Sequence, residues 1–332
     1  MITRLESPYS SRRSFLRDTA LTLPMLGITG FAAPDRIRIG QIGTRHAHAA
    51  GKLAAIQTLP EVFEVVGIVE PDDDRWAAVS STTPYSGTSR LTEEDLFETP
   101  SLRAVAVETD IFELVPTAKR CLEAGFHIHL DKPAGESLEA CKEMHAIATE
   151  KSLTIQMGYM LRYNPAFQFL YEVLERGWLG EVTEVSGMMG KWISDAAREE
   201  LAQYQGGGMF ELACHLIDQV VSVLGKPEKV TAFTRQSFPD KDTFSDNQLA
   251  VFDYPKAIAT VRCNHIDPMG GPRRQFSVTG TEGTLEIRPL ESGSVRLGLS
   301  ADRGEFRKGF QDLNFPRKGG RYDAEFLDLA QV

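Results

Sequence analysis

The first folded stretch of this sequence alternates strand, helix and strand, and this alternation restricts the fold more than any other feature. Residues 36–43 predict an apolar strand, residues 47–59 a helix, and residues 64–70 a second strand that ends in Glu70, twenty-seven residues after Gly43. This is the βαβ layout of a dinucleotide-binding fold, in which an acid at the end of the second strand accepts hydrogen bonds from a ribose diol.

Strands and helices keep alternating up to residue 157. The further strands are predicted at 102–109, 126–130 and 153–157, and the further helices at 114–124 and 138–151. Right-handed crossovers assemble such a series into a parallel sheet that is covered on both faces. We therefore predict a Rossmann-like, doubly wound α/β domain over residues 35–155.

The pattern changes after Gly158, where a helix at 166–176 is followed by longer β-like segments joined by short turns. These segments are 181–192, 228–236, 246–254, 257–265, 273–280 and 283–288. Hairpin-length links between consecutive strands indicate an antiparallel sheet, and a helix predicted at 209–224 would cover one face of it. Residues 156–332 are therefore predicted to form an α/β domain with an open, mostly antiparallel sheet.

The loop after the first strand departs from the usual phosphate-binding pattern. Against G-x-G-x-x-G, only Gly43 survives, and Arg45 and His48 stand at the other two glycine positions. Arg45 either supplies a cation to the phosphates or blocks them, and the sequence leaves both readings open. Glu70, with three aspartates close behind it, repels a 2′-phosphate, so NAD is favoured over NADP.

His46 and His48 form an H-x-H pair, a spacing found in metal sites. No partner ligands follow at a recognisable spacing, and the four cysteines are too widely separated to add any. The sequence therefore predicts no metal site.

Lys132 and His215 are the leading candidates for proton chemistry. Lys132 follows an apolar strand, at the carboxyl end where ligands of open parallel sheets bind. Glu211, His215 and Asp218 fall at i, i+4 and i+7 of an apolar-periodic segment, so one helix would place all three on one face. A lysine and an imidazole that share a proton suit the interconversion of an alcohol and a carbonyl.

Residues 1–33 form a separate targeting segment in this interpretation. Arg12 and Arg13, followed by Phe15 and Leu16, resemble the twin-arginine export motif. The export machinery is then an expected partner, and the periplasm or another exported location is expected; the cytoplasm is expected if the signal does not function. Free nicotinamide nucleotides are scarce outside the cytoplasm, so a protein exported by this route must keep its cofactor or do without one.

The net charge restricts the partners of the chain. Its formal value is -10, which argues against nucleic acid or an anionic membrane as the main partner.

From residue 36 to its end, the chain resembles the glucose-fructose oxidoreductase and inositol dehydrogenase (Gfo/Idh/MocA) family. The pieces that carry this resemblance are 40–44, Asp131-Lys132-Pro133 where the family has Glu-Lys-Pro, 162–165, 206–208, and 211–218 where it has Asp-x-Gly-x-His-x-x-Asp. Each is weak alone, but their order and spacing are specific. The family combines a Rossmann domain with an α/β domain whose open sheet commonly builds dimers, so a homo-oligomer formed through the C-terminal sheet is expected.

The resemblance also implies residue roles. Lys132 is the lysine that contacts the reacting hydroxyl, His215 the acid/base, and Glu211 the acid that touches substrate or orients the histidine. Asp218 is placed to hold the ring of His215 or to line the substrate pocket. The implied carbohydrate-binding residues are Arg162, Tyr163 and Asp218. The residues expected to bind NAD are Gly43, Thr44, Arg45, His46, Glu70, Thr109, Asp131 and Lys132.

Three departures keep other functions open. The second and third glycines of the phosphate-binding pattern are lost, and Asp110 and Ile111 stand where the family has proline and asparagine. The chain also stops in what looks like the middle of a helix, as a truncated product would.

The expected function is an NAD(P)-dependent oxidoreductase acting on a sugar, cyclitol or glycoside, with tightly retained NAD. The alternatives are an NAD-retaining glycosidase of the same family and a non-catalytic sugar-binding protein that has lost its cofactor.

Overall fold

The computed structural model describes residues 36–332, which form one compact unit. The predicted targeting segment at 1–33 lies outside these described residues. Within them, no helix is both long enough and apolar enough to cross a membrane.

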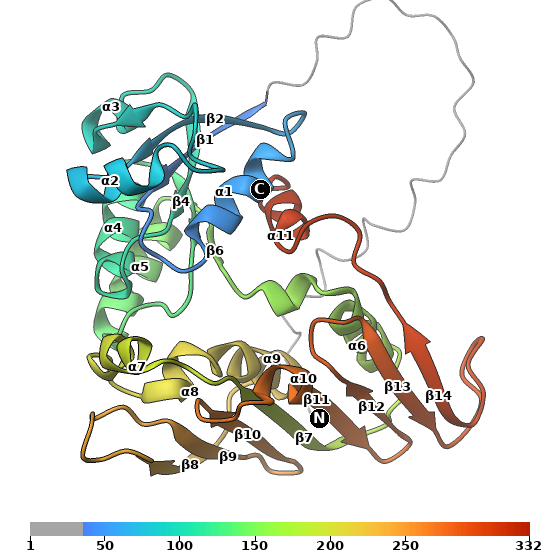
Figure 1. Cartoon of the computed structure of the whole chain (residues 1–332). Helices are drawn as coiled ribbons and strands as arrows, with labels where there is room; N and C mark the ends of the chain where they lie inside the picture. The colour runs from blue at the N-terminus through green and yellow to red at the C-terminus, as the bar shows by residue number, and fades with distance from the viewer. Residues whose placement is uncertain (1–35) are drawn as a thin grey trace, which may run out of the picture. The chain divides into compact units, whose positions relative to one another are not determined.

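The first half of the unit contains a six-stranded parallel sheet (Figure 1). Its strands are β1 (Ile37–Ile42), β2 (Phe63–Val69), β3 (Arg90–Leu91), β4 (Leu102–Val107), β5 (His127–Leu130) and β6 (Ile155–Met157). Their order, β3-β2-β1-β4-β5-β6, is that of the dinucleotide-binding fold. The predicted Rossmann-like fold of this part of the chain is confirmed.

Helices connect these strands, and several of them begin after a residue whose side chain caps the helix. They are α1 (Ala49–Gln57), α2 (Asp73–Val79), α3 (Glu93–Phe97), α4 (Ile111–Glu123) and α5 (Leu138–Glu150). The Asp72 carboxylate accepts from the Arg75 amide, and the Ser137 hydroxyl accepts from the Ala140 amide. Such caps satisfy amides that have no partner inside the helix.

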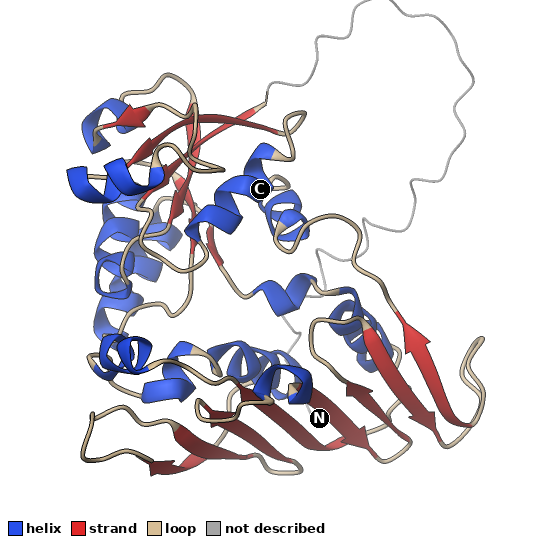
Figure 2. Ribbon diagram, viewed as in Figure 1, coloured by secondary structure: helices blue, strands red, loops and turns tan. Residues whose placement is uncertain are grey.

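The second half contains an eight-stranded sheet in the order β14-β13-β12-β11-β7-β10-β9-β8 (Figure 2). The strands are β7 (Val182–Gly190), β8 (Lys229–Arg235), β9 (Asn247–Asp253), β10 (Ile258–Asn264), β11 (Gln275–Gly280), β12 (Gly283–Ile287), β13 (Ser294–Leu299) and β14 (Gly309–Asn314). All neighbours are antiparallel except β7 and β10, which run parallel. The predicted open, mostly antiparallel sheet is confirmed.

The sheet packs on helices on one face. The remaining helices are η2 (Met160–Tyr163), α6 (Pro165–Glu175), α7 (Asp195–Ala202), α8 (Gly207–Glu211), α9 (Cys214–Leu224), α10 (Gly270–Arg273) and α11 (Asp323–Leu329). Phe167 of α6 and Leu216 of α9 are fully buried with Val185 and Phe276 of the sheet.

The single helix predicted at 209–224 is wrong, because the chain forms two helices there. The Gly208 carbonyl accepts from the amides of both Leu212 and Ala213, so the chain makes a wide turn that ends α8. Gly207 and Gly208 pack too closely against Ser245 and His265 to carry a side chain. The break removes the common helical face that the spacing of Glu211, His215 and Asp218 indicates.

The C-terminal helix α11 packs against the first domain, beside α1 in Figure 1. Lys52 of α1 and Glu325 of α11 are both fully buried, and their Nζ and Oε2 atoms lie 2.5 Å apart. Phe326 packs between the rings of Phe63 and His129. Residues at the end of the chain therefore complete the core of the domain at its beginning.

Glu325→Gln is expected to destabilise the protein by about 3–5 kcal/mol, because it removes the carboxylate that is hydrogen-bonded to the buried Lys52 charge. Replacing both residues, as Lys52→Met with Glu325→Leu, is expected to recover only part of this loss, because Lys52 also lowers the pKa of the buried Asp131 carboxylate. Urea unfolding of the three variants measures both effects. The exposed pair Lys119–Glu143 is the control, since solvent screens it and Glu143→Gln is expected to cost far less than Glu325→Gln. Equal costs at the two sites would contradict the burial argument.

Candidate active site

A cavity of about 770 Å³ lies at the carboxyl ends of β1, β2 and β4. Gly43, Glu70 and Thr109 are among the residues that line it. The strand order of this sheet reverses between β1 and β4. Ligands of open α/β folds bind at the carboxyl ends of the strands beside such a reversal. With Arg45, which also lines it, the cavity therefore contains four of the predicted cofactor residues.

Position 43 requires a glycine. Its φ of +90° is one that side-chain-bearing residues rarely adopt, and a Cβ there would lie 2.7 Å from the Glu108 carbonyl oxygen and the Thr109 amide nitrogen. The end of β1 thus approaches the loop after β4 closely enough to form one wall of the cavity.

Glu70 holds the loop after β1. Its carboxylate is 3% exposed overall and accepts hydrogen bonds from the Thr44 amide at 3.1 Å and the Thr44 hydroxyl at 2.7 Å. The other oxygen accepts from the Asp72 amide at 3.1 Å. Both oxygens therefore position the loop, and the ribose contact predicted for Glu70 stays a prediction.

Arg45 connects two sides of the cavity. Its guanidinium pairs with Asp72 after β2, and its Nε lies 3.7 Å from an Asp110 oxygen after β4. Two separate departures from the family pattern, Arg45 and Asp110, are thus in contact. All three side chains are more than a third exposed, so solvent screens both pairs and a bound pyrophosphate can recruit the guanidinium at small cost.

Lys132 and Glu211 lie 79 residues apart in the chain but are in contact. The lysine side chain is 5% exposed, and its Nζ donates to the Glu211 carbonyl oxygen at 2.9 Å. The Glu211 carboxylate lies 4.0 Å from the same nitrogen. The end of β5 and the end of α8 are therefore joined through one ammonium group.

The Glu211 carboxylate has two further partners that the sequence pattern did not indicate. Lys191 Nζ lies 2.9 Å from one oxygen, and His265 Nε2 lies 3.0 Å from it. These contacts hold the pKa of Glu211 well below its usual value despite burial. Lys191 and His265 come just after β7 and β10, whose register alone places them side by side.

His215 is buried beside the Tyr159 ring, with the ring centroids 6.1 Å apart. Its Nδ1 has no hydrogen-bond partner among the described residues. Burial, and then the nearby Lys132 charge, hold the pKa of His215 well below its usual value. The imidazole is therefore neutral at pH 7 and able to accept a proton.

Asp218 does not hold the His215 ring, so that expectation is wrong. Its carboxylate instead receives hydrogen bonds from Arg162, at 2.9 and 3.1 Å from Nε. The physical reason is that α9 packs on η2, where the Arg162 guanidinium binds both oxygens of Asp218. Tyr163 donates to the Asp328 carboxylate at 2.9 Å and so faces α11; its predicted role toward substrate stays a prediction.

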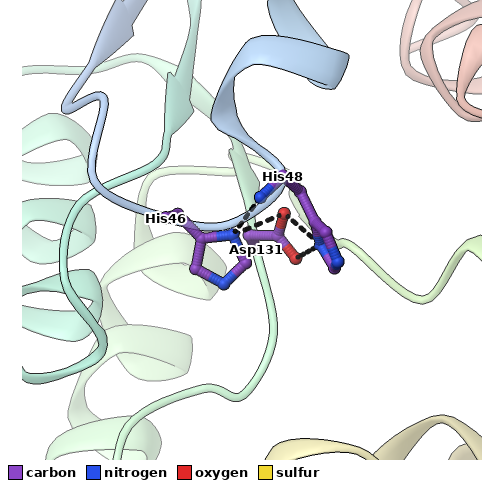
Figure 3. Close-up of side chains that lie close together, drawn as sticks. All are labelled: His46, His48 and Asp131. Atoms are coloured by element: carbon purple, nitrogen blue, oxygen red, sulfur yellow. Dashed lines mark hydrogen bonds and ion pairs between the residues drawn. The ribbon is translucent and has the colours of Figure 1, made fainter. Parts of the chain in front are cut away.

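Asp131 lies between His46 and His48 (Figure 3). It is fully buried, and one of its oxygens also accepts from the Lys132 amide at 2.7 Å. These bonds fix the backbone from which Lys132 projects.

Two family models match the chain. Residues 37–159 match the oxidoreductase family with an NAD-binding Rossmann fold. Residues 167–286 match the GFO/IDH/MocA C-terminal domain.

The chain belongs to the Gfo/Idh/MocA family. Its cofactor is accordingly NAD, bound by the Rossmann domain.

The individual proteins that match this chain share only a small part of its sequence. The uncharacterized oxidoreductase YhhX of Escherichia coli K12 is 29% identical over 64% of this chain and 60% of its own. The scyllo-inositol 2-dehydrogenase (NADP(+)) IolW of Bacillus subtilis is 22% identical over 65% of this chain and 58% of its own. The match thus spans about three fifths of either relative. Levoglucosan dehydrogenase, solved with NADH and levoglucosan, superposes with a TM-score of 0.77 at 18% identity over 89% of this chain and 88% of its own.

Glu211→Gln is expected to destabilise the Gfo/Idh/MocA protein by about 1–3 kcal/mol at pH 7, because two cations and His265 lose their shared carboxylate. The folded-state pKa of Glu211 is lowered, so its stabilisation is complete above the unfolded value of about 4.5 and is lost as pH falls below it. The difference in Tm between wild type and variant should shrink over that range. Glu228→Gln, at an exposed position, is the control. A difference that does not depend on pH would contradict the charge assignment.

Proposed function

We propose that this protein is an NAD-dependent oxidoreductase that acts on a hydroxylated ring such as a sugar, cyclitol or glycoside, and that it retains its NAD. The observation that carries the proposal is the pairing of buried Lys132 with Glu211 beside a neutral His215. The names of IolW and of levoglucosan dehydrogenase, a cyclitol and an anhydrosugar enzyme, support the substrate class.

The residues present fit a dinucleotide. Gly43 allows close approach at the end of β1, Thr109 lines the opposite wall, and the Arg45 guanidinium can turn to the pyrophosphate. Asp72 and Asp73 line the same cavity near the position of the adenosine ribose in this fold. Bound NAD supplies a hydride acceptor for the substrate carbon.

The side chains of this chain manage the proton. Lys132 has donor hydrogens to spare beyond the Glu211 carbonyl, so it can bind the substrate hydroxyl and stabilise the negative charge that develops on its oxygen. His215, neutral and buried, accepts the hydroxyl proton during oxidation and returns it during reduction. Glu211 neutralises the lysine and keeps Nζ in place.

Retention of NAD follows from the export proposal, which rests on the Arg12-Arg13 motif. An exported enzyme without a supply of NAD must close its redox cycle on one cofactor molecule. Oxidation of one sugar coupled to reduction of another does so, as does the cycle of an NAD-retaining glycosidase, which is the alternative activity.

A homo-oligomer formed through the C-terminal sheet is part of the proposal. The sheet face opposite the helices carries exposed aromatic and aliphatic side chains, among them Phe233, Ile258 and Phe310, each more than half exposed. Apolar side chains on an open sheet face are typical of surfaces that associate.

Denaturing the purified mature protein is expected to release close to one equivalent of NAD, measured by mass spectrometry. Arg45→Ala is expected to release less, because the pyrophosphate loses its cation. Lys256→Ala, at an exposed surface pair, is the control. A protein that releases no nucleotide and does not bind added NAD would exclude the enzyme and support the sugar-binding alternative, in which Arg45 and Asp110 obstruct the cavity.

Lys132→Met and His215→Asn are each expected to reduce turnover by at least about 100-fold, the lower range for general acid–base groups, while sugar binding measured by calorimetry persists. The depressed pKa of His215 places the acidic limb of the wild-type rate profile well below pH 6.5, because the neutral form is present above that pKa. In a less damaging variant, Lys132→Gln, residual activity should show this limb at higher pH, since a positive neighbour is gone. Activity that survives both main substitutions would refute the assignment.

A further inference from the structure

A cluster of nitrogen and oxygen atoms behind Lys132 takes no direct part in the proton transfer proposed above. His46 Nδ1 lies 3.2 Å from one Asp131 oxygen. His48 Nδ1 lies 3.0 and 3.2 Å from the two Asp131 oxygens. Figure 3 shows both rings turned toward the carboxylate from opposite sides. The side chains of His46, His48 and Asp131 are 5%, 17% and 0% exposed.

A second carboxylate points into the same cluster. Glu108 is fully buried, and neither of its oxygens has a hydrogen-bond partner among the described residues. One of these oxygens lies 3.5 Å from His46 Nδ1. A buried carboxylate without a partner is costly, and its presence calls for a ligand or an ion.

The tautomer of His46 is set by its backbone contacts. Nε2 lies 2.9 Å from the Lys132 carbonyl oxygen, which can only accept, so Nε2 carries the hydrogen. Nδ1 is therefore the ring nitrogen that faces Asp131 and Glu108. Against the effect of burial, these carboxylates raise the pKa of His46 to about 9, so a bound ion would take the place of a proton on Nδ1. In metal sites the same arrangement, with the second nitrogen bonded to a carbonyl, orients the ligating histidine.

The charges near the cluster also leave room for a cation. Lys52, the buried lysine on α1, is paired with Glu325, and Lys132 directs its Nζ to Glu211. Lys52 also lowers the pKa of Asp131, but one lysine cannot balance the three buried carboxylates of Glu325, Asp131 and Glu108. One divalent cation bound to two neutral histidines would balance the carboxylates of Asp131 and Glu108.

We propose that His46 Nδ1, His48 Nδ1 and an Asp131 oxygen bind a divalent first-row transition-metal ion, with Glu108 as a further or water-bridged ligand. The candidate atoms of the triad lie within 4.8 Å of one another, a spacing that small side-chain shifts bring to bonds of about 2.0–2.2 Å. Two imidazoles and a carboxylate suit Zn²⁺, Fe²⁺ or Mn²⁺, whereas Mg²⁺ and Ca²⁺ prefer oxygen ligands. The prediction that no metal site exists relied on spacing along the chain, and the strand order brings Asp131 to the histidine pair from 83 residues away.

The test is metal binding by the untagged mature protein after treatment with a chelator. Zn²⁺ and Co²⁺ are titrated in by calorimetry, and the content after gel filtration is measured by mass spectrometry. One equivalent is expected to bind. His48→Gln, which keeps an amide donor for Asp131, and Asp131→Asn are expected to weaken binding by more than about 100-fold, beyond the 10–100-fold typical of outer-shell changes. Mg²⁺ should not compete.

His145→Gln is the matched control, since His145 is an exposed histidine on α5. Thermal unfolding without metal establishes that each variant is folded, and the Co²⁺ absorption spectrum reports nitrogen ligation in any variant that retains binding. Stoichiometric binding that His48→Gln leaves unchanged would place the ion elsewhere and overturn the proposal. No stoichiometric uptake by the wild type would also overturn it and would mean that a proton joins His46 to Asp131.

The outcome is independent of the proposed oxidoreductase function. Metal content and released NAD are measured on the same preparation by different methods. An empty metal site in a protein that holds NAD would refute only the metal proposal, and a nucleotide-free protein that binds Zn²⁺ at the triad would refute only the oxidoreductase.

Discussion

The buried charge of Asp131 is the constraint on which the rest of this site depends. The carboxylate has no exposure to solvent, yet its pKa is held well below the usual value by Lys52, His46 and His48. A buried anion is tolerated only when its neighbours compensate it. Each of those neighbours comes from α1 or from the loop before it, so the compensation fixes where that loop runs relative to β5.

Two further consequences follow from this compensation. The Lys132 amide donates to Asp131, which sets the direction in which the Lys132 side chain leaves β5. Lys52 needs a partner of its own, and Glu325 of α11 supplies it from the far end of the chain. The position of the lysine assigned to the reaction and the packing of the last helix are therefore coupled through one buried carboxylate.

Much of the architecture could be predicted because it depends on local patterns. Alternating apolar strands and helices with short links lead to a parallel sheet, and hairpin-length links lead to an antiparallel one. The roles of Lys132, His215 and Glu211 were inferred from resemblance to a family, whereas the contact of Lys132 with Glu211 was seen only in the structure. The break between α8 and α9 was not predictable, since it arises from close packing of Gly207 and Gly208 on residues far along the chain.

By itself, the sequence determined the fold class and the residue types available for proton transfer and dinucleotide binding. The tertiary structure decided which of these residues meet. It paired Arg45 with Asp110, moved Asp218 from His215 to Arg162, and added Lys191 and His265 to Glu211. The reason is physical: the period of a helix or strand is set by neighbouring residues, whereas the partners of a buried charge are set by strand register and packing between segments that are distant in sequence.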